Sequence, residues 1–191
     1  MLSELRIDYQ NKFVISSVAR YHPVKDIPNF IEAISVVKKK YPNTIALLCG
    51  KGEDITNNEL IKVIDGFHLE LNKDIFLLGE RNDLPMVYSA SDLFILHSVS
   101  EASPNCLLEA MSCRTLCLAT DVGNVRDLIE DKDLIVPPKE PMELATKIIK
   151  AIELSDKEKN RIKEANRIKI KQKYSIEKCV EIYEMFYEKN Y

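Results

Sequence analysis

Short apolar segments rich in β-branched residues alternate along this chain with longer segments in which apolar residues recur every three or four positions. The first pattern is typical of buried strands, and the second is typical of helices that pack on a sheet. Their alternation predicts βα units that build a parallel sheet with helices on both faces, a doubly wound α/β fold. The predicted strands are Phe13–Ala19, Thr44–Cys49, Ile75–Leu78, Leu93–Leu96, Leu116–Thr120 and Leu134–Val136.

Helical periodicity is clearest over Ile27–Lys40, where apolar residues at i, i+3, i+4 and i+7 form one stripe. Further helices are predicted over Glu59–Asn72, Leu84–Ser89, Leu107–Cys113 and Met142–Leu154, the last of them entered through Pro141. In doubly wound folds the ligand binds beyond the carboxyl ends of the strands. We therefore expect the functional residues in the loops that follow the strands.

The composition changes after Ser155. The segment Lys157–Lys173 holds eight basic residues and two acidic ones, and Ser175 opens a second helix with an apolar stripe. No predicted strand follows, so we divide the chain into a sheet domain over 13–155 and a helical tail over 156–191. Two hypotheses fit the basic helix, contact with anionic lipid and a solvated helix face, and the second is favoured.

Charge and hydropathy exclude several classes of protein. The 27 Lys and Arg residues nearly balance the 30 Asp and Glu residues, for a net charge of −3, which argues against a dedicated nucleic-acid-binding domain. No apolar run reaches the roughly 18 residues needed to span a bilayer, and the N-terminal residues lack the apolar stretch of a signal peptide. The five cysteines form no C-x-x-C pair, which predicts reduced thiols of a cytoplasmic protein rather than bridges or zinc ligands.

The loops after the first two predicted strands carry groups suited to phosphate. Arg20 and Lys25 lie on a turn stiffened by Pro23, so both could reach one diphosphate. A bidentate guanidinium beside a compact ammonium is a common arrangement for binding phosphate. Two solvated surface cations would give the same pattern. After the second strand, Gly50 and Gly52 would let the backbone approach a phosphate or a base, although an ordinary turn is the default explanation.

A helix start follows the fourth predicted strand. Ser103 is predicted to cap this helix and Pro104 to be its first residue. The free amides of Asn105 and Cys106 would then face the crevice together with the positive end of the helix dipole. Such a helix start is an anion-binding site.

Two carboxylates flank this helix start. Glu101 lies in the loop before it, and Glu109 lies just over one turn into the helix. They could accept hydrogen bonds from two separate hydroxyl clusters, one on a sugar and one on a ribose. The alternative makes Glu101 a loop charge and Glu109 an ordinary exposed helix residue, and both explanations stay open on these residues alone.

These segments together resemble one known family. The stretch from about Phe13 to Pro138 is similar to the C-terminal, donor-binding domain of group 1 glycosyltransferases, retaining enzymes with the two-domain, Rossmann-like GT-B fold. The motifs that carry the resemblance are Arg20-Tyr-His-Pro-Val-Lys25-Asp, Gly50-Lys-Gly52, Leu77-Leu-Gly79-Glu-Arg81-Asn-Asp83, Ala90-Ser-Asp92-Leu-Phe, Glu101-x7-Glu109-Ala-Met and Thr120-Asp121-Val-Gly123. The first and third motifs look most like those of bacterial transferases that build surface polysaccharides.

The resemblance implies a role for each candidate residue. Arg20 and Lys25 would bind the donor diphosphate and stabilise its charge as it leaves. Glu101 would hold the hydroxyls of the transferred sugar, and Glu109 those of the ribose. The other donor-binding residues implied are Gly50, Gly52, Arg81 in the loop that frames the base, Ser103, Asn105 and Cys106. No metal or other cofactor is implied, because fixed cations and a helix terminus take the place of a divalent ion.

The sequence departs from the commonest family pattern at a few positions. Ala102 and Ser103 stand where glycine and an aromatic residue are usual, and Asn124 stands in place of a second glycine. Arg114 and Leu116 replace a glycine and a proline. Because a residue that follows a helix often needs a positive φ, the side chain of Arg114 would cost around 1 kcal/mol.

Two tempting sites are set aside. Asp131-Lys-Asp133 spells the D-x-D of metal-dependent transferases, but it falls in a turn remote from the other loops. His97 stands where relatives often carry proline. It could line the sugar pocket, yet it has no partner motif that would indicate a catalytic role.

The resemblance also implies a larger enzyme. GT-B enzymes place an acceptor-binding domain before the donor domain, so residues 1–12 are expected to be an interdomain linker remnant, and this chain alone is expected to be inactive. The expected partners are a nucleotide sugar and, through the missing domain, a glycan or lipid-linked acceptor, with no nucleic acid. The expected location is the cytoplasm, with peripheral contact at the inner face of the membrane as a further hypothesis.

The apolar stripe within 175–189 would lack part of its cover, so we expect some self-association through it.

Two alternatives accompany this interpretation. The chain could also be a non-catalytic nucleotide-sugar-binding or assembly module derived from the same family. A flavodoxin-like or response-regulator domain would need a ring-binding or phosphoacceptor site that the sequence does not offer.

Overall fold

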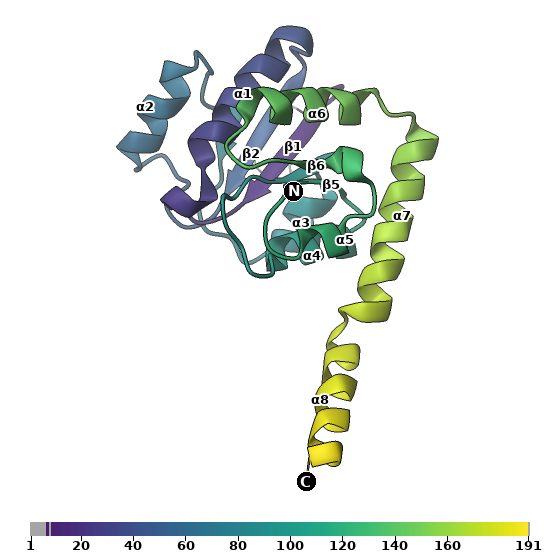
Figure 1. Cartoon of the computed structure of the whole chain (residues 1–191). Coiled ribbons are helices and arrows are strands. Elements are labelled where there is room, and N and C mark those ends of the chain that lie inside the picture. Colours follow the sequence, from purple (N-terminus) through teal and green to yellow (C-terminus); the bar gives the residue numbers. More distant parts are fainter. Residues whose placement is uncertain (1–6, 8, 191) are drawn as a thin grey trace.

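A six-stranded parallel sheet forms the centre of the computed structural model, which describes residue 7 and residues 9–190. Its strand order is β3-β2-β1-β4-β5-β6, and Figure 1 labels β2, β1, β6 and β5 among these strands. The strands are β1 (Phe13–Val18), β2 (Thr44–Cys49), β3 (Ile75–Leu77), β4 (Leu93–Leu96), β5 (Leu116–Thr120) and β6 (Ile135–Val136). β1 and β4 are neighbours at the point where the strand order reverses, which is where such sheets bind ligands. The prediction of a Rossmann-like α/β fold is confirmed.

The strand ends differ slightly from their predicted bounds. β1 ends one residue early, although Ala19 N still donates to Cys49 O at 3.0 Å and so extends the ladder by one bond. β3 likewise ends before Leu78. β6 begins at Ile135 because the residues before it form a 3-10 turn, η2 (Lys132–Leu134).

Short connections join the strands to their helices. The helices of the sheet domain are η1 (Pro23–Lys25), α1 (Ile27–Lys40), α2 (Asn58–Gly66), α3 (Leu84–Ser89), α4 (Asn105–Ser112), α5 (Val125–Leu128) and α6 (Pro141–Glu153). The prediction that the second of the long helices runs to Asn72 is wrong. It stops at Gly66 because His68 adopts a left-handed conformation, with a φ of 57°, and Leu71 bridges to Ile75 at the sheet edge.

The helices cover both faces of the sheet. α1 packs against α2 and α6, whereas α4 packs against α3 and α7 on the other side. Phe30 and Ile34 of α1, and Leu107 and Met111 of α4, are completely buried. Burial of each such side chain contributes about 1.5–3 kcal/mol. The carboxyl ends of the strands, which carry the candidate loops, are thereby held in place from both faces of the sheet.

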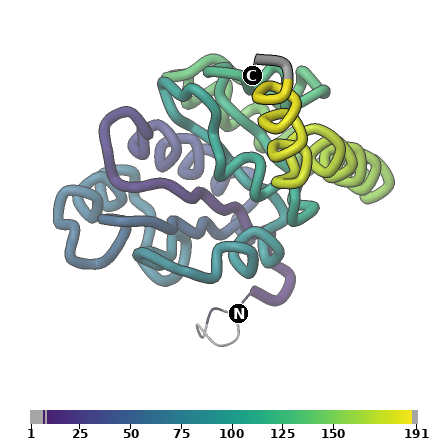
Figure 2. Tube along the Cα trace, turned by 90° about the horizontal axis from the view of Figure 1, so that it is seen from below, coloured from purple at the N-terminus to yellow at the C-terminus, as the bar shows by residue number. Residues whose placement is uncertain are grey.

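The tail consists of two helices, α7 (Asp156–Lys173) and α8 (Ile176–Asn190), as the sequence predicts. Ser155 caps α7 by accepting a hydrogen bond from Glu158 N at 3.2 Å. α7 packs on α4 and buries Ile162 and Ile170. α8 projects beyond the sheet domain in Figure 1, and in Figure 2, seen from below, it lies nearest the viewer beside α7.

The expected interdomain linker is described only in part. Residues 1–6 and 8 lie outside the described residues, whereas Ile7 is buried in a small apolar cluster with Val14, Ile45 and Leu47. Among the helices that the structure describes, none has the length and apolar content needed to cross a membrane.

Candidate functional site

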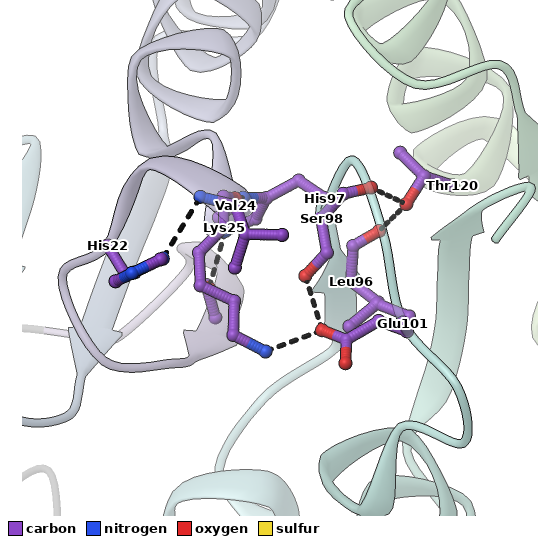
Figure 3. Close-up of polar contacts among 9 residues, drawn as sticks. His22, Val24, Lys25, Leu96, His97, Ser98, Glu101 and Thr120 are labelled. Atoms are coloured by element: carbon purple, nitrogen blue, oxygen red, sulfur yellow. Dashed lines mark hydrogen bonds and ion pairs between the residues drawn. The ribbon is translucent and has the colours of Figure 1, made fainter. Parts of the chain in front are cut away.

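The loop after β1 presents Lys25 toward the loop after β4. The side chain of His22 caps η1 by accepting from Val24 N at 3.2 Å, and Asp26 turns the chain into α1 with a φ of 51°. This short turn directs the Lys25 ammonium at Glu101, and Nζ lies 2.5 Å from Oε1 (Figure 3). The exposed fractions of the two side chains are 19% and 15%, so the ion pair is largely shielded from water.

Glu101 uses one carboxylate oxygen for two partners. Oε1 accepts from Lys25 Nζ and from Ser98 Oγ, the latter at 2.7 Å (Figure 3). Thr120 in turn holds the backbone of Ser98, since its Oγ1 donates to Ser98 O at 2.6 Å. Within the described residues, no hydrogen bond is made to Oε2 of Glu101. The structure thus joins two residues that the sequence had assigned to different parts of a ligand.

Arg20 lies at the same edge of the sheet but is not part of this cluster. Its side chain is exposed and forms no ion pair with any described residue. Gly50 lies beside it: a Cβ atom at Gly50 would come within 1.7 Å of Ala19 O. Gly50, whose φ is 153°, therefore has a structural reason to be glycine, the close approach of two loops. Gly52 follows with a φ of 79°.

The start of α4 differs from the sequence prediction. Pro104, and not Ser103, is the residue that caps the helix: its ψ of 99° is extended, and the helix begins at Asn105. The Ser103 hydroxyl instead accepts a hydrogen bond from Asn124 Nδ2 at 3.3 Å. The expected free amides remain, because Asn105 and Cys106 are the first two residues of α4 and have no acceptor within the helix.

Glu109 is exposed on α4 and is held by a residue that sequence reasoning missed. Tyr88 of α3 is completely buried, and its hydroxyl donates to Glu109 Oε2 at 2.9 Å. Burial and the neighbouring carboxylate raise the pKa of Tyr88, so the phenol remains a donor. The available signal was a tyrosine at a core position of a short apolar helix, since a buried hydroxyl needs a partner.

A cavity of about 720 Å³ opens beside this pair. Arg81 and Glu109 both line it. These are the residues that the resemblance assigns to the base and to the ribose, respectively. Arg81 is held in place by Asp83, with bonds of 2.7 and 2.6 Å from Nε and Nη2. The opposite wall comes from the junction of α7 and α8, where Tyr174 and Ser175 lie. No pattern along the sequence connects the tail with this site.

Glu53 is a second residue without a predicted role. Its main chain links the loops after β2 and β3, because Glu53 N donates to Gly50 O and Gly79 N donates to Glu53 O. Its carboxyl group is completely buried, and neither oxygen has a hydrogen-bond partner among the described residues. Burial raises the pKa of Glu53 to about 9, so the group is protonated at neutral pH.

The structure gives partners to the residues for which the sequence predicts no catalytic or metal-binding role. Asp131 accepts from Asp133 N at 3.0 Å and so starts η2, while Asp133 pairs with Lys147 at 2.9 Å. His97 is buried beneath the loop that carries Lys25, not on the surface of a pocket. Arg114 has a φ of 61°, which confirms the expected left-handed conformation after α4, and its guanidinium pairs with Glu164 at 2.8 Å.

An open parallel sheet with helices on both faces is the architecture of Rossmann-like proteins, and its ligands bind at the switch point. Within that class, the chain belongs to the family described as glycosyl transferases group 1, whose model matches residues 6–169. The matching solved structures are GT-B glycosyltransferases.

Individual relatives agree with this assignment. The UDP-Gal:alpha-D-GlcNAc-diphosphoundecaprenol alpha-1,3-galactosyltransferase of Escherichia coli is 30% identical over 125 residues, which are 64% of this chain and 32% of that protein. The chain spans about a third of the length of such curated relatives.

Two solved structures resemble the chain over nearly all of its length. Anabaena HepE, solved in complex with UDP and glucose, matches with a TM-score of 0.81 and 28% identity over 98% of this chain and 51% of that chain. The C-terminal domain of the group 1 glycosyl transferase LpcC from Francisella tularensis matches with a TM-score of 0.72 and 25% identity, over 90% of this chain and 92% of that one.

Proposed function

We propose that this chain is the donor-binding half of a retaining glycosyltransferase, which moves a sugar from a nucleotide sugar to a glycan or lipid-linked acceptor in surface polysaccharide synthesis. One observation carries the proposal. At the sheet's switch point, Lys25 and Ser98 hold one oxygen of Glu101, and Tyr88 holds one oxygen of Glu109. Each carboxylate is fixed in place and has its second oxygen available to a hydroxyl group.

Arg20 and Lys25 would bind the diphosphate of the donor. The Lys25 ammonium has three N–H donors, and the bond to Glu101 occupies one of them. The guanidinium of Arg20 is exposed at the same edge, and the amides of Asn105 and Cys106 at the start of α4 would take a further phosphate oxygen. These groups support the proposal that the donor binds without a divalent ion.

The cavity beside Glu109 would hold the nucleoside. Its volume of about 720 Å³ lies in the range of small-molecule sites. The free oxygen of Glu109 would accept from a ribose hydroxyl, and the Arg81 loop would border the base. The wall formed by Tyr174, which is half-buried, would cover the base on its other side.

The transferred sugar would lie between the diphosphate site and Glu101. In the reaction, the bond between the anomeric carbon and the diphosphate oxygen breaks, and its electron pair leaves with the diphosphate. A bond to the acceptor oxygen forms on the same face, and the proton of the acceptor hydroxyl passes to the departing diphosphate oxygen. Arg20 and Lys25 would stabilise the charge that develops on the leaving group. Glu101 would hold a sugar hydroxyl through Oε2.

The acceptor would bind to a separate domain. The Escherichia coli relative is named for a diphosphoundecaprenol-linked acceptor, which supports a lipid-linked substrate for this chain as well. α8 supports a partner domain, because Ile176 and Tyr183 are 75% and 66% exposed. We place the protein in the cytoplasm, since its five cysteines are free. The basic residues of α7 make a membrane contact a secondary hypothesis.

Calorimetric titration of the chain tests this function. UDP, uridine and a panel of nucleotide sugars are compared, each with EDTA and with Mg²⁺. We expect the diphosphate to bind more tightly than the nucleoside, with the same affinity in both buffers. Equal affinities for uridine and UDP would contradict the diphosphate site, and sugar transfer by the isolated chain would contradict the two-domain proposal. Binding without transfer in a full two-domain protein would favour the non-catalytic module.

A further inference from the structure

His97 occupies a buried position directly after β4, between the two loops of the site. Its exposed fraction is 2%, and its ring stacks on Phe30 with a centroid distance of 4.8 Å. Nε2 lies 2.7 Å from Ser17 Oγ, and Nδ1 lies 2.5 Å from Lys25 O. Figure 3 shows the ring close to the main chain of Lys25. A histidine so completely partnered is unsuited to proton transfer with a ligand.

The partners determine where the proton of His97 lies. A backbone carbonyl oxygen only accepts hydrogen bonds, so Nδ1 must carry the proton that it donates to Lys25 O. Burial lowers the pKa of His97 to about 4, so the ring is neutral at physiological pH and Nε2 is an acceptor. The Ser17 hydroxyl therefore donates to Nε2. The chain of bonds runs from β1 through the ring to the Lys25 carbonyl.

These bonds fix the main chain of the residue whose ammonium reaches Glu101. Val99 N donates to Val24 O at 2.9 Å and so joins the same two loops a second time. Lys25 is thus held at its carbonyl by His97 and at its ammonium by Glu101. An apolar side chain at this position would have no donor that could make the first of these contacts.

We propose that His97 is a positioning residue, which aims Lys25 at the donor diphosphate by holding its backbone carbonyl from the neutral, Nδ1-protonated ring. The proposal rests on the proposed function for the role of Lys25. It predicts that loss of the Nδ1 donor weakens binding of a diphosphate but not of a nucleoside, because the cavity at Glu109 does not include His97 or Lys25.

Two variants separate the ring nitrogens. His97→Asn keeps an amide donor near the position of Nδ1, whereas His97→Gln places its amide near Nε2 and loses the bond to Lys25 O. We expect His97→Gln to lower the affinity for UDP about tenfold with uridine unchanged, the effect of one lost hydrogen bond, and His97→Asn to stay within about threefold of the wild type. Thermal melting of both variants, and of Ser17→Ala, controls for folding.

Other results would overturn the proposal. If His97→Gln keeps the wild-type ratio of UDP to uridine affinity, or if Asn and Gln reduce it equally, the Nδ1 donor does not position Lys25. A ¹⁵N spectrum of the histidine ring that places the proton on Nε2 would also refute it.

A third measurement separates this inference from the proposed function. Amide hydrogen exchange at Val24 and Lys25 should become faster in His97→Gln and stay slow in His97→Asn, whatever ligand the chain binds. Wild-type protein without a preference for UDP would contradict the proposed function, while the exchange rates still decide whether His97 holds the loop.

Discussion

The two carboxylates of the site lie in contrasting environments. Glu101 is largely shielded, with 15% of its side chain exposed, and a cation and a serine bond to it. Glu109 is exposed on α4, and a neutral phenol holds it. The first is therefore paired with a cation and shielded from water, whereas the second lies beside an open cavity. Both are oriented by one oxygen, so orientation at this sheet edge does not require an opposite charge.

Glu53 extends this comparison to a carboxyl group with neither kind of partner. It is buried a few residues after β2, and its pKa of about 9 leaves it neutral. The three side chains are chemically identical, yet one is paired, one is solvated and one is protonated. The environment, not the residue type, decides which of them can carry charge at pH 7.

The largest effect is expected for Glu53→Gln. The folded chain keeps a proton at Glu53 that the unfolded chain loses above its ordinary pKa of 4.5. As the pH rises from about 5 to 8, the free energy of unfolding of the wild type should therefore fall relative to that of the variant. The expected slope is up to about 1.4 kcal/mol per pH unit. Urea unfolding across this range measures it. Parallel pH profiles of the two proteins would show that Glu53 is ionised or partnered in the fold.

Lys25→Ala tests the shielded side of the comparison. It removes a proposed phosphate contact and leaves Glu101 without its cation, so UDP affinity should fall about 100-fold while uridine affinity is unchanged. Lys39→Ala, the same change on an exposed lysine at the far end of α1, is the matched control. A similar loss in both variants would mean that overall charge, and not the Lys25 site, governs binding.

The two glutamates should differ in which ligand they affect. Glu109→Ala should weaken UDP and a UDP-sugar alike, by about tenfold, because its proposed partner is the ribose. Glu101→Ala should weaken the sugar conjugate more than UDP, because Glu101 holds the ammonium of Lys25 as well as the proposed sugar hydroxyl. Calorimetry with both ligands on both variants measures the pattern. Equal losses for both ligands in both variants would show that the roles are not divided in this way.

Tyr88→Phe tests the exposed carboxylate, Glu109. The substitution removes only the hydroxyl that orients Glu109, so nucleoside and nucleoside diphosphate should both bind about fivefold more weakly. The ring stays in the core, and the melting temperature should change little. If uridine binds normally to this variant, Glu109 does not depend on Tyr88 for its orientation.

The smallest effect is expected outside the site, on α8. Tyr183 and Phe186 are 66% and 61% exposed, and we expect weak self-association through them. The double variant Tyr183→Glu, Phe186→Glu should sediment as a monomer at concentrations where the wild type partly associates. Donor affinity should be the same in both, since neither residue lines the cavity at Glu109. A wild type that is monomeric at every concentration would refute the association.

Local patterns were sufficient for most of the fold. Strand and helix periods, with turn residues between them, located every strand of the sheet to within a residue or so, because each period reflects which face of an element is buried. The error at the helix after β2 has a local cause as well: apolar residues continue past Gly66, but they pack at the sheet edge instead of continuing the helix.

The sequence by itself determined which residues occupy the loops at the carboxyl edge, since the order of strands and the motifs beside them are written along the chain. Only the tertiary structure decided how those residues combine. Lys25 and Glu101 are 76 positions apart, and His97 reaches Lys25 across 72. Contacts over such separations depend on the packing of β1 against β4, and no periodicity along the chain encodes the direction in which a loop side chain points.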